Sequence, residues 1–270
     1  MLPSFLIIFR EALEVSLIVG IILSFLLKTN QTKYNNTVYI GVLAGVLISI
    51  VAGFLIIVFK ANFEGTAEQI FEGTTMLIGA VLLTSMIFWM MKQKKITEQL
   101  HVKISTHIQS ASKIGLFSLA FVSVLREGIE TVIFLSAANA STDSIDFIGV
   151  ILGFSFAILL GYLIFVISIK INIRKFFKYT SILLIFFAAG LVAHGIHEFV
   201  EAGLIPSVID QVYDINYILS DKSEFGLILK GLFGYNGNPT LIEVISYFGY
   251  LAFAYIYWNY TRTNSTDKVS

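Results

Sequence analysis

Five stretches of the chain are apolar, long and free of Asp, Glu, Lys and Arg: residues 38–59, 73–91, 147–169, 179–197 and 244–261. About 20 apolar residues cross the hydrocarbon core of a bilayer as a helix, so each stretch predicts a transmembrane helix. Only 13% of all residues are charged, against roughly a quarter in an ordinary soluble domain. The sequence therefore excludes a soluble globular protein and predicts contact with a lipid bilayer.

Two further stretches, 2–27 and 114–142, are long enough to span but carry charges near their middle. In the first, Arg10, Glu11 and Glu14 lie where the apolar core of a signal peptide would be, so we expect a retained helix. Counting both stretches, the predicted fold is an all-α integral membrane protein, with residues 1–270 forming a single transmembrane domain of seven helices.

Basic residues gather in alternate loops. Thirteen of the 18 Lys and Arg lie in segments 28–37, 92–113, 170–178 and 262–270, and the other loops hold only Lys60, Lys222 and Lys230. Because Lys and Arg concentrate in cytoplasmic loops, we expect the N-terminus outside and the C-terminus inside a cell membrane, the bacterial cytoplasmic membrane. Residues 92–113 also carry apolar side chains every four positions, which fits either a membrane-surface helix or a solvated loop.

The chain contains an internal repeat. The segment Arg-Glu-Ala-Leu-Glu at 10–14 resembles Arg-Glu-Gly-Ile-Glu at 126–130, and the following helices share one glycine spacing at Gly41, Gly45, Gly53 and at Gly149, Gly153, Gly161. This predicts two three-helix repeats, 1–91 and 114–203, then an extracytoplasmic loop at 204–240 and a seventh helix at 241–258. Because each repeat has an odd number of spans, the second repeat crosses the membrane in the opposite orientation to the first. Inverted repeats of this kind are found in secondary transporters that bind substrate at the membrane midplane. The glycines predict close helix packing.

The two charged motifs supply four carboxylates, Glu11, Glu14, Glu127 and Glu130, against two guanidinium groups, Arg10 and Arg126. Burying the formal excess of two negative charges is unfavourable unless protons or a cation join it. Carboxylate oxygens suit hard metal ions, so we predict that the four Glu bind a metal cation. The alternative is a structural ion-pair lock between the first and fourth helices.

A second polar group is predicted at the outer helix ends. It combines Glu64, Glu68 and Glu72 at the start of the third helix with His194, His197, Glu198 and Glu201 at the end of the sixth. We predict an outer vestibule that includes Glu64 and His194 and concentrates cations, with the other five as metal ligands. The alternative is solvated helix ends. Met86, Met90 and Met91 with Trp89 are interpreted as packing at the membrane interface.

These motifs resemble the high-affinity iron permease family, which includes the fungal ferric permease that pairs with a multicopper oxidase and bacterial EfeU-type permeases. The resemblance covers nearly the whole chain and also rests on Phe-Glu-Gly at 71–73, the run 83–91 and the segment 194–203. It implies a transporter rather than an enzyme, importing iron as Fe3+ after oxidation of Fe2+. It also implies that the four Glu are transport carboxylates, that Arg10 and Arg126 are their motif partners, and that iron is substrate with no cofactor permanently bound.

The resemblance further implies an extracytoplasmic oxidase or iron-binding protein as partner, separate from this chain, which is of the short form. No nucleic-acid partner is expected at zero net charge, and homo-oligomerisation is left open. The chain has no cysteine, so thiolate sites are excluded and Cu(I) lacks its preferred ligands. Two alternatives remain: a transporter of another metal cation, divalent or lead, and a non-transporting membrane scaffold subunit.

Overall fold

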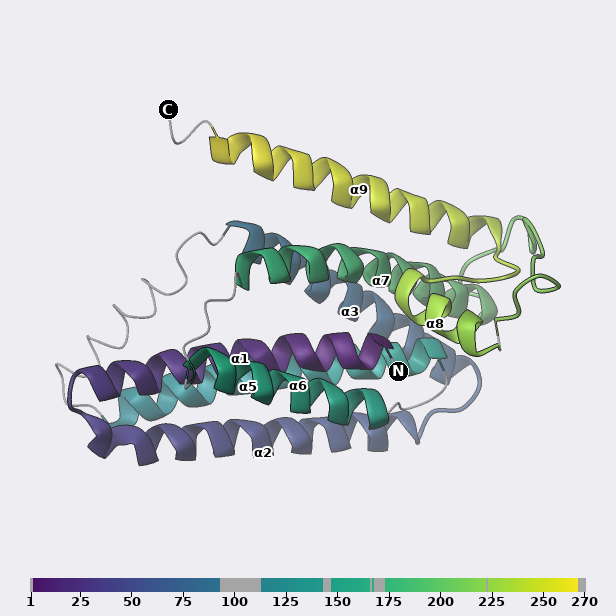
Figure 1. The fold of residues 1–270 in the computed structure, drawn as a ribbon. Helices are drawn as coiled ribbons and strands as arrows, with labels where there is room; N and C mark the ends of the chain where they lie inside the picture. Colours follow the sequence, from purple (N-terminus) through teal and green to yellow (C-terminus); the bar gives the residue numbers. More distant parts are fainter. Residues whose placement is uncertain are drawn as a thin grey trace.

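The computed structural model describes residues 2–92, 113–142, 147–165, 167, 173–221 and 223–266. All regular structure in this part of the chain is helical (Figure 1). The elements are α1 (Leu2–Lys28), a short 3-10 turn (Thr32–Tyr34), α2 (Asn35–Lys60), α3 (Thr66–Lys92), α5 (Lys113–Thr142), α6 (Phe147–Phe165), α7 (Ile173–Glu201), α8 (Glu224–Phe233) and α9 (Leu241–Thr266).

Within the described residues, five helical segments are long and apolar enough to cross a membrane: Thr32–Lys60, Thr66–Trp89, Phe147–Phe165, Phe177–Glu201 and Leu241–Tyr260. They overlap the five charge-free stretches, which confirms, for the part of the chain that the structure describes, an all-helical fold consistent with an integral membrane protein. The charged helices α1 and α5 are of similar length, 27 and 30 residues. That α1 and α5 also cross the membrane, which would bring the number of spans to seven, stays a prediction. The segment 92–113 lies almost entirely outside the described residues.

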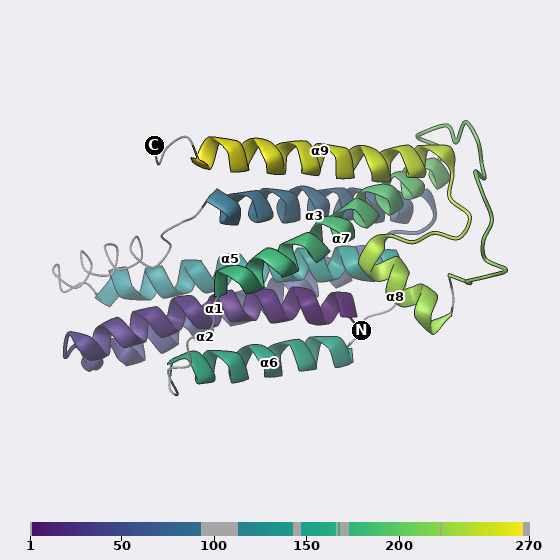
Figure 2. The same ribbon diagram turned by 45° about the horizontal axis from the view of Figure 1, so that its top comes forward.

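Successive long helices run in opposite directions (Figures 1 and 2). The N-terminus, the α2–α3 connection and α8 lie at one end of the bundle, and the C-terminus lies at the other. Segment 204–240, predicted as a loop, contains the short helix α8. Ser223 caps its start by accepting a hydrogen bond from the Gly226 N–H at 3.0 Å, and Gly234 ends it in the left-handed region at φ 65°. The seventh helix, α9, continues to Thr266, beyond the predicted end at 258.

The most extensive helix contacts are α2 with α5, α1 with α6, and α3 with α7. Glycine makes the first of these close. A Cβ placed on Gly45 of α2 would lie 3.0 Å from the Val124 Cβ and 3.1 Å from the Phe121 backbone oxygen, both on α5. Only the missing side chain lets α2 approach the α5 backbone this closely.

The contact between α1 and α6 is built in the same way. A Cβ on Gly153 of α6 would lie 2.9 Å from both the Ile8 Cβ and the Phe5 backbone oxygen of α1. Phe5 and Ile8 lie five and two residues before the arginine of the first motif, as Phe121 and Val124 do before that of the second. The first helix of each predicted repeat therefore packs on the second helix of the other, and the repeat bounds themselves stay a prediction.

The orientation predicted from the loop charges can be checked in this cysteine-free chain. We expect a cysteine introduced at Ser105 to react with an impermeant thiol reagent only from the cytoplasmic side. A cysteine at Tyr217, whose side chain is exposed in the segment that the loop charges assign to the outside, is expected to react from outside. The opposite labelling pattern in intact cells would invert the topology.

Candidate cation site

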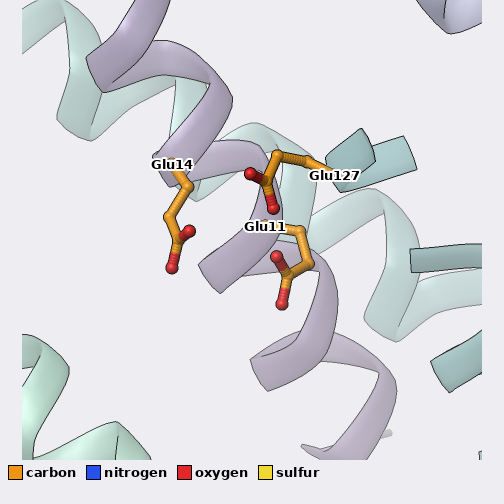
Figure 3. Close-up of side chains that lie close together, drawn as sticks. All are labelled: Glu11, Glu14 and Glu127. Carbon is orange, nitrogen blue, oxygen red and sulfur yellow. The ribbon is translucent and has the colours of Figure 1, made fainter. Parts of the chain in front are cut away.

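Three carboxylates of the two charged motifs meet where α1 and α5 cross. Glu11 and Glu14 come from α1 and Glu127 from α5, and one oxygen of each lies within 4.8 Å of the others (Figure 3). Among the described residues this is the one group of three or more acidic, His or Cys side chains with that geometry. Glu11 and Glu127 are buried and Glu14 is half-buried.

Arg10 fixes the two carboxylates of α1. Its Nη1 lies 2.8 Å from Glu11 Oε1 and its Nη2 lies 2.8 Å from Glu14 Oε1. Glu14 is reached because residues four apart share a helix face. Glu11 lies about 100° around the helix axis from Arg10. The arginine side chain is long enough for its two terminal nitrogens to pair with both carboxylates. The guanidinium is fully buried.

Arg126 holds the carboxylates of α5 less evenly. Its Nε donates to Glu130 Oε1 at 2.9 Å and lies 3.7 Å from Glu127 Oε1. Glu130 does not belong to the compact group of three. It is linked to that group through Arg126, which contacts both Glu130 and Glu127. All four predicted carboxylates and both predicted motif partners therefore form one continuous cluster.

Several carboxylate oxygens in this cluster are buried without a hydrogen-bond partner within the described structure: Oε2 of Glu11, of Glu127 and of Glu130. A buried carboxylate oxygen without a partner is strongly unfavourable. Oxygen atoms arranged in this way are the ligands of hard cations. The residues of both motifs thus fit a metal ion that would satisfy the free oxygens and offset the two excess negative charges.

Two side chains of α3 belong to this site, although their sequence pattern was interpreted as interface packing. Met86 is buried with its Sδ against Arg10 Nη1, and the Trp89 ring lies 5.1 Å from the Arg126 guanidinium carbon. Phe177 of α7 faces Arg10 at 5.9 Å. These contacts join helices distant in sequence, and no local pattern indicates them. The side chains of Met90 and Met91 lie outside the described residues.

The acidic stripe predicted at the start of α3 is only partly formed. Helix α3 begins at Thr66, so the exposed Glu64 precedes it and the prediction of three helical acids is wrong at this residue. Glu72 is buried and forms an ion pair with Lys60 of α2. Glu68 is half-buried in the first turn of α3. One of the three acids is thus already neutralised by a lysine.

The predicted group at the end of α7 lies next to the start of α3, as expected. Gln69 Nε2 donates to Glu201 Oε2 at 3.2 Å, and a Cβ on Gly73 would lie 3.1 Å from the Glu198 Cβ. His194 is buried, with its Nδ1 2.9 Å from the Gly190 backbone oxygen of its own helix. The structure thus brings the two helix ends together but places their acids and histidines in separate contacts rather than in one compact group.

His197 contacts two carboxylates, one on each side of its ring. Its Nδ1 lies 2.9 Å from Glu243 Oε1 of α9, and its Nε2 lies 3.1 Å from Glu201 Oε1. Sequence reasoning missed Glu243, which Thr240 also binds through its N–H at 3.1 Å. A Thr-x-x-Glu pattern before an apolar run is the signature of a capping box, so the signal was present. The contact between His197 and Glu243 therefore connects α7 to α9.

Comparison with known proteins finds relatives over nearly the whole chain. The model of the iron permease FTR1 family matches residues 1–260. The ferrous iron permease EfeU of Yersinia pestis is 38% identical over 258 residues, covering 93% of this chain and 90% of that protein. The protein of the same name from Escherichia coli O6:H1 (strain CFT073) is 37% identical over 255 residues, covering 93% and 92%. No solved structure shows a significant match.

Proposed function

The chain belongs to the iron permease FTR1 family, and from this premise we propose that it imports iron through the carboxylate cluster between α1 and α5. The family is one of membrane transporters rather than enzymes, which agrees with the apolar helices of this chain. The observation that supports the proposed path is the group formed by Glu11, Glu14 and Glu127, with buried oxygens that have no hydrogen-bond partner. A structural lock alone would have no need of these unsatisfied acids.

The proposed path begins at the outer helix ends. Glu68, Glu198 and Glu201 would raise the local cation concentration, and the central Glu side chains would bind the dehydrated ion. Glu68→Gln is then expected to raise the half-saturating iron concentration without lowering the maximal rate. Its effect should shrink at high ionic strength, because salt screens exposed charges. Loss of transport at saturating iron would instead assign Glu68 to the obligatory path.

Two oxidation states are candidates for the bound ion. The family resemblance implies Fe3+, produced from Fe2+ and delivered by an extracytoplasmic oxidase or iron-binding partner, since free ferric iron hydrolyses in neutral water. The charge of the cluster supports the second candidate, Fe2+, because two positive charges offset the formal excess of two negative ones. The relatives named above are ferrous iron permeases by name, which agrees with the second candidate.

Uptake of radiolabelled iron into proteoliposomes tests the proposal. We expect uptake of iron to continue in the presence of excess Mn2+ or Zn2+. One arm supplies Fe2+ anaerobically with a reductant, and the other supplies a ferric chelate. Uptake confined to the ferric arm supports Fe3+, and uptake confined to the anaerobic arm removes the need for an oxidase. Efficient transport of Mn2+ or Zn2+ with iron ignored would support the alternative of another metal cation.

A further inference from the structure

The two motifs are equivalent in sequence but their arginines have different surroundings. The Arg10 side chain is completely buried, whereas the Arg126 side chain is 44% exposed. Arg126 lies near the middle of α5 between Val122 and Ile129, which are also exposed on that helix. A lipid-facing arginine at the middle of a membrane is costly, and such residues generally face a water-filled cavity or the bundle interior. The carboxylate cluster is therefore shielded from water on the side of Arg10 and accessible to water on the side of Arg126.

Arg10 is held on several sides at once. It has ion pairs of 2.8 Å to both Glu11 and Glu14, its Nη1 contacts the Met86 sulfur, and its guanidinium faces the Phe177 ring. Moving this group would break two charge-assisted contacts inside a water-excluded region, where each is strong. Arg10 therefore acts as a fixed countercharge for the carboxylates of α1.

Arg126 has a single close ion pair, Nε to Glu130 Oε1 at 2.9 Å, and a longer approach of 3.7 Å to Glu127. Its guanidinium carbon lies 5.1 Å from the Trp89 ring, which is itself 42% exposed. A cation over an indole face is stabilised by attraction to the ring's π electrons, and tryptophan provides the strongest such contact. Arg126 can therefore leave Glu130 while it keeps contact with Trp89 and water.

We propose that Arg126 is a displaceable counter-ion of the transport site and that Trp89 holds it when it is displaced. A metal ion bound by Glu127 and Glu130 takes the oxygens that Arg126 neutralises in the empty site, and the guanidinium keeps the indole face, which it already contacts, as its remaining partner. When the metal leaves, Arg126 pairs with Glu130 again and the site returns to its empty charge balance. This inference rests on the proposed function, because it needs a cation that competes for the same carboxylates.

The position of Trp89 indicates the side on which this exchange takes place. Trp89 lies three residues before the last residue of α3, Lys92, at the helix end that the loop charges assign to the cytoplasm. Arg126 would then compete with the metal on the release side. Its return to Glu130 would favour loss of the ion into the cell rather than backward movement.

Equilibrium binding of radiolabelled iron to the purified full-length protein separates the two arginines. Arg126→Gln removes the competitor, so we expect iron to bind about tenfold more tightly, which corresponds to one charge-assisted contact of about 1.4 kcal/mol, and to be released more slowly from preloaded protein. Arg10→Gln, the matched change in the first motif, is expected to weaken binding. Weaker binding by Arg126→Gln as well would overturn the proposal. Absence of iron binding by the wild-type protein would instead contradict the proposed function.

A double-mutant cycle tests the role of Trp89. Trp89→Ala is expected to weaken iron binding about threefold, in the direction opposite to Arg126→Gln, because the displaced guanidinium loses its partner. Trp89→Phe, which keeps an aromatic face, is expected to restore most of the affinity. In the Arg126→Gln background, Trp89→Ala should change nothing. An equal effect of Trp89→Ala in both backgrounds would show that Trp89 acts through packing alone and would contradict its assignment.

Discussion

Glu127→Gln is expected to abolish iron uptake while the protein stays folded in the membrane. The glutamine has nearly the same shape but removes one of the charges that a bound cation must meet. Loss of an outer partner of a metal ligand costs about 10–100-fold in metal affinity or activity. A carboxylate that contacts the ion directly should cost at least as much, so we expect the uptake rate to fall by about 100-fold or more.

The structure makes Glu127 the most informative of the four carboxylates. Its approach to Arg126 is 3.7 Å, while Arg126 keeps a contact of 2.9 Å with Glu130. The change therefore leaves no arginine without a partner, and folding should be unaffected. Uptake of radiolabelled iron into proteoliposomes is the measurement, with size-exclusion elution as the test of folding. Glu64→Gln, at an exposed position before α3, is the control and should transport normally at saturating iron.

A normal uptake rate for Glu127→Gln would exclude the cluster as the path. The charges would then serve to pair α1 with α5, as in a scaffold subunit. Reduced uptake together with loss of the folded protein would also favour that structural role. Glu127→Gln therefore separates the two roles. A transport path predicts a folded protein that no longer takes up iron, whereas a structural lock predicts that uptake is lost only if the protein also fails to fold.

Much of the site could be predicted from the sequence because its cause is local or repeated. The absence of charges over about 20 residues determines where a helix can cross a bilayer. Helical spacing places Arg10 beside Glu14, and the recurrence of this pattern at 126–130 places a second cluster at an equivalent depth. The glycine spacing in turn indicated which faces of the second and fifth long helices pack closely, although it did not name their partners.

Other features depended on contacts that no local pattern encodes. Met86 and Trp89 have the composition of an interfacial belt, and only the packing of α3 against α5 places them against the arginines. The acidic vestibule was overestimated for a similar reason, since Lys60 lies twelve residues before Glu72 and reaches it only because the chain turns between α2 and α3. The asymmetry between Arg10 and Arg126 has the same origin, because identical motifs have different neighbours.

Gly45→Leu and Gly153→Leu are expected to destabilise the folded protein by similar amounts. At both positions the new Cβ would approach a backbone oxygen and a β-carbon of the facing helix within 3.1 Å. A backbone atom cannot rotate away as a side chain can, so the helices must separate. Overpacking of this kind usually costs about 1–3 kcal/mol, and occasionally more. Separation of α2 from α5 or of α1 from α6 would also disturb the helices that carry the four carboxylates.

Gly249→Leu provides the matched control, because a Cβ at this position of α9 meets nothing within 4 Å. Leucine is a better helix former than glycine by somewhat less than 1 kcal/mol, so this variant should be neutral or slightly more stable. The measurement is the Tm of the detergent-purified protein. If the equivalent glycines of two repeats carry equivalent contacts, Gly45→Leu and Gly153→Leu lower the Tm together while Gly249→Leu does not. A Tm lowered at only one of the two positions would contradict the equivalence of the repeats, because both contacts lie at the same distance before the arginine of their motif.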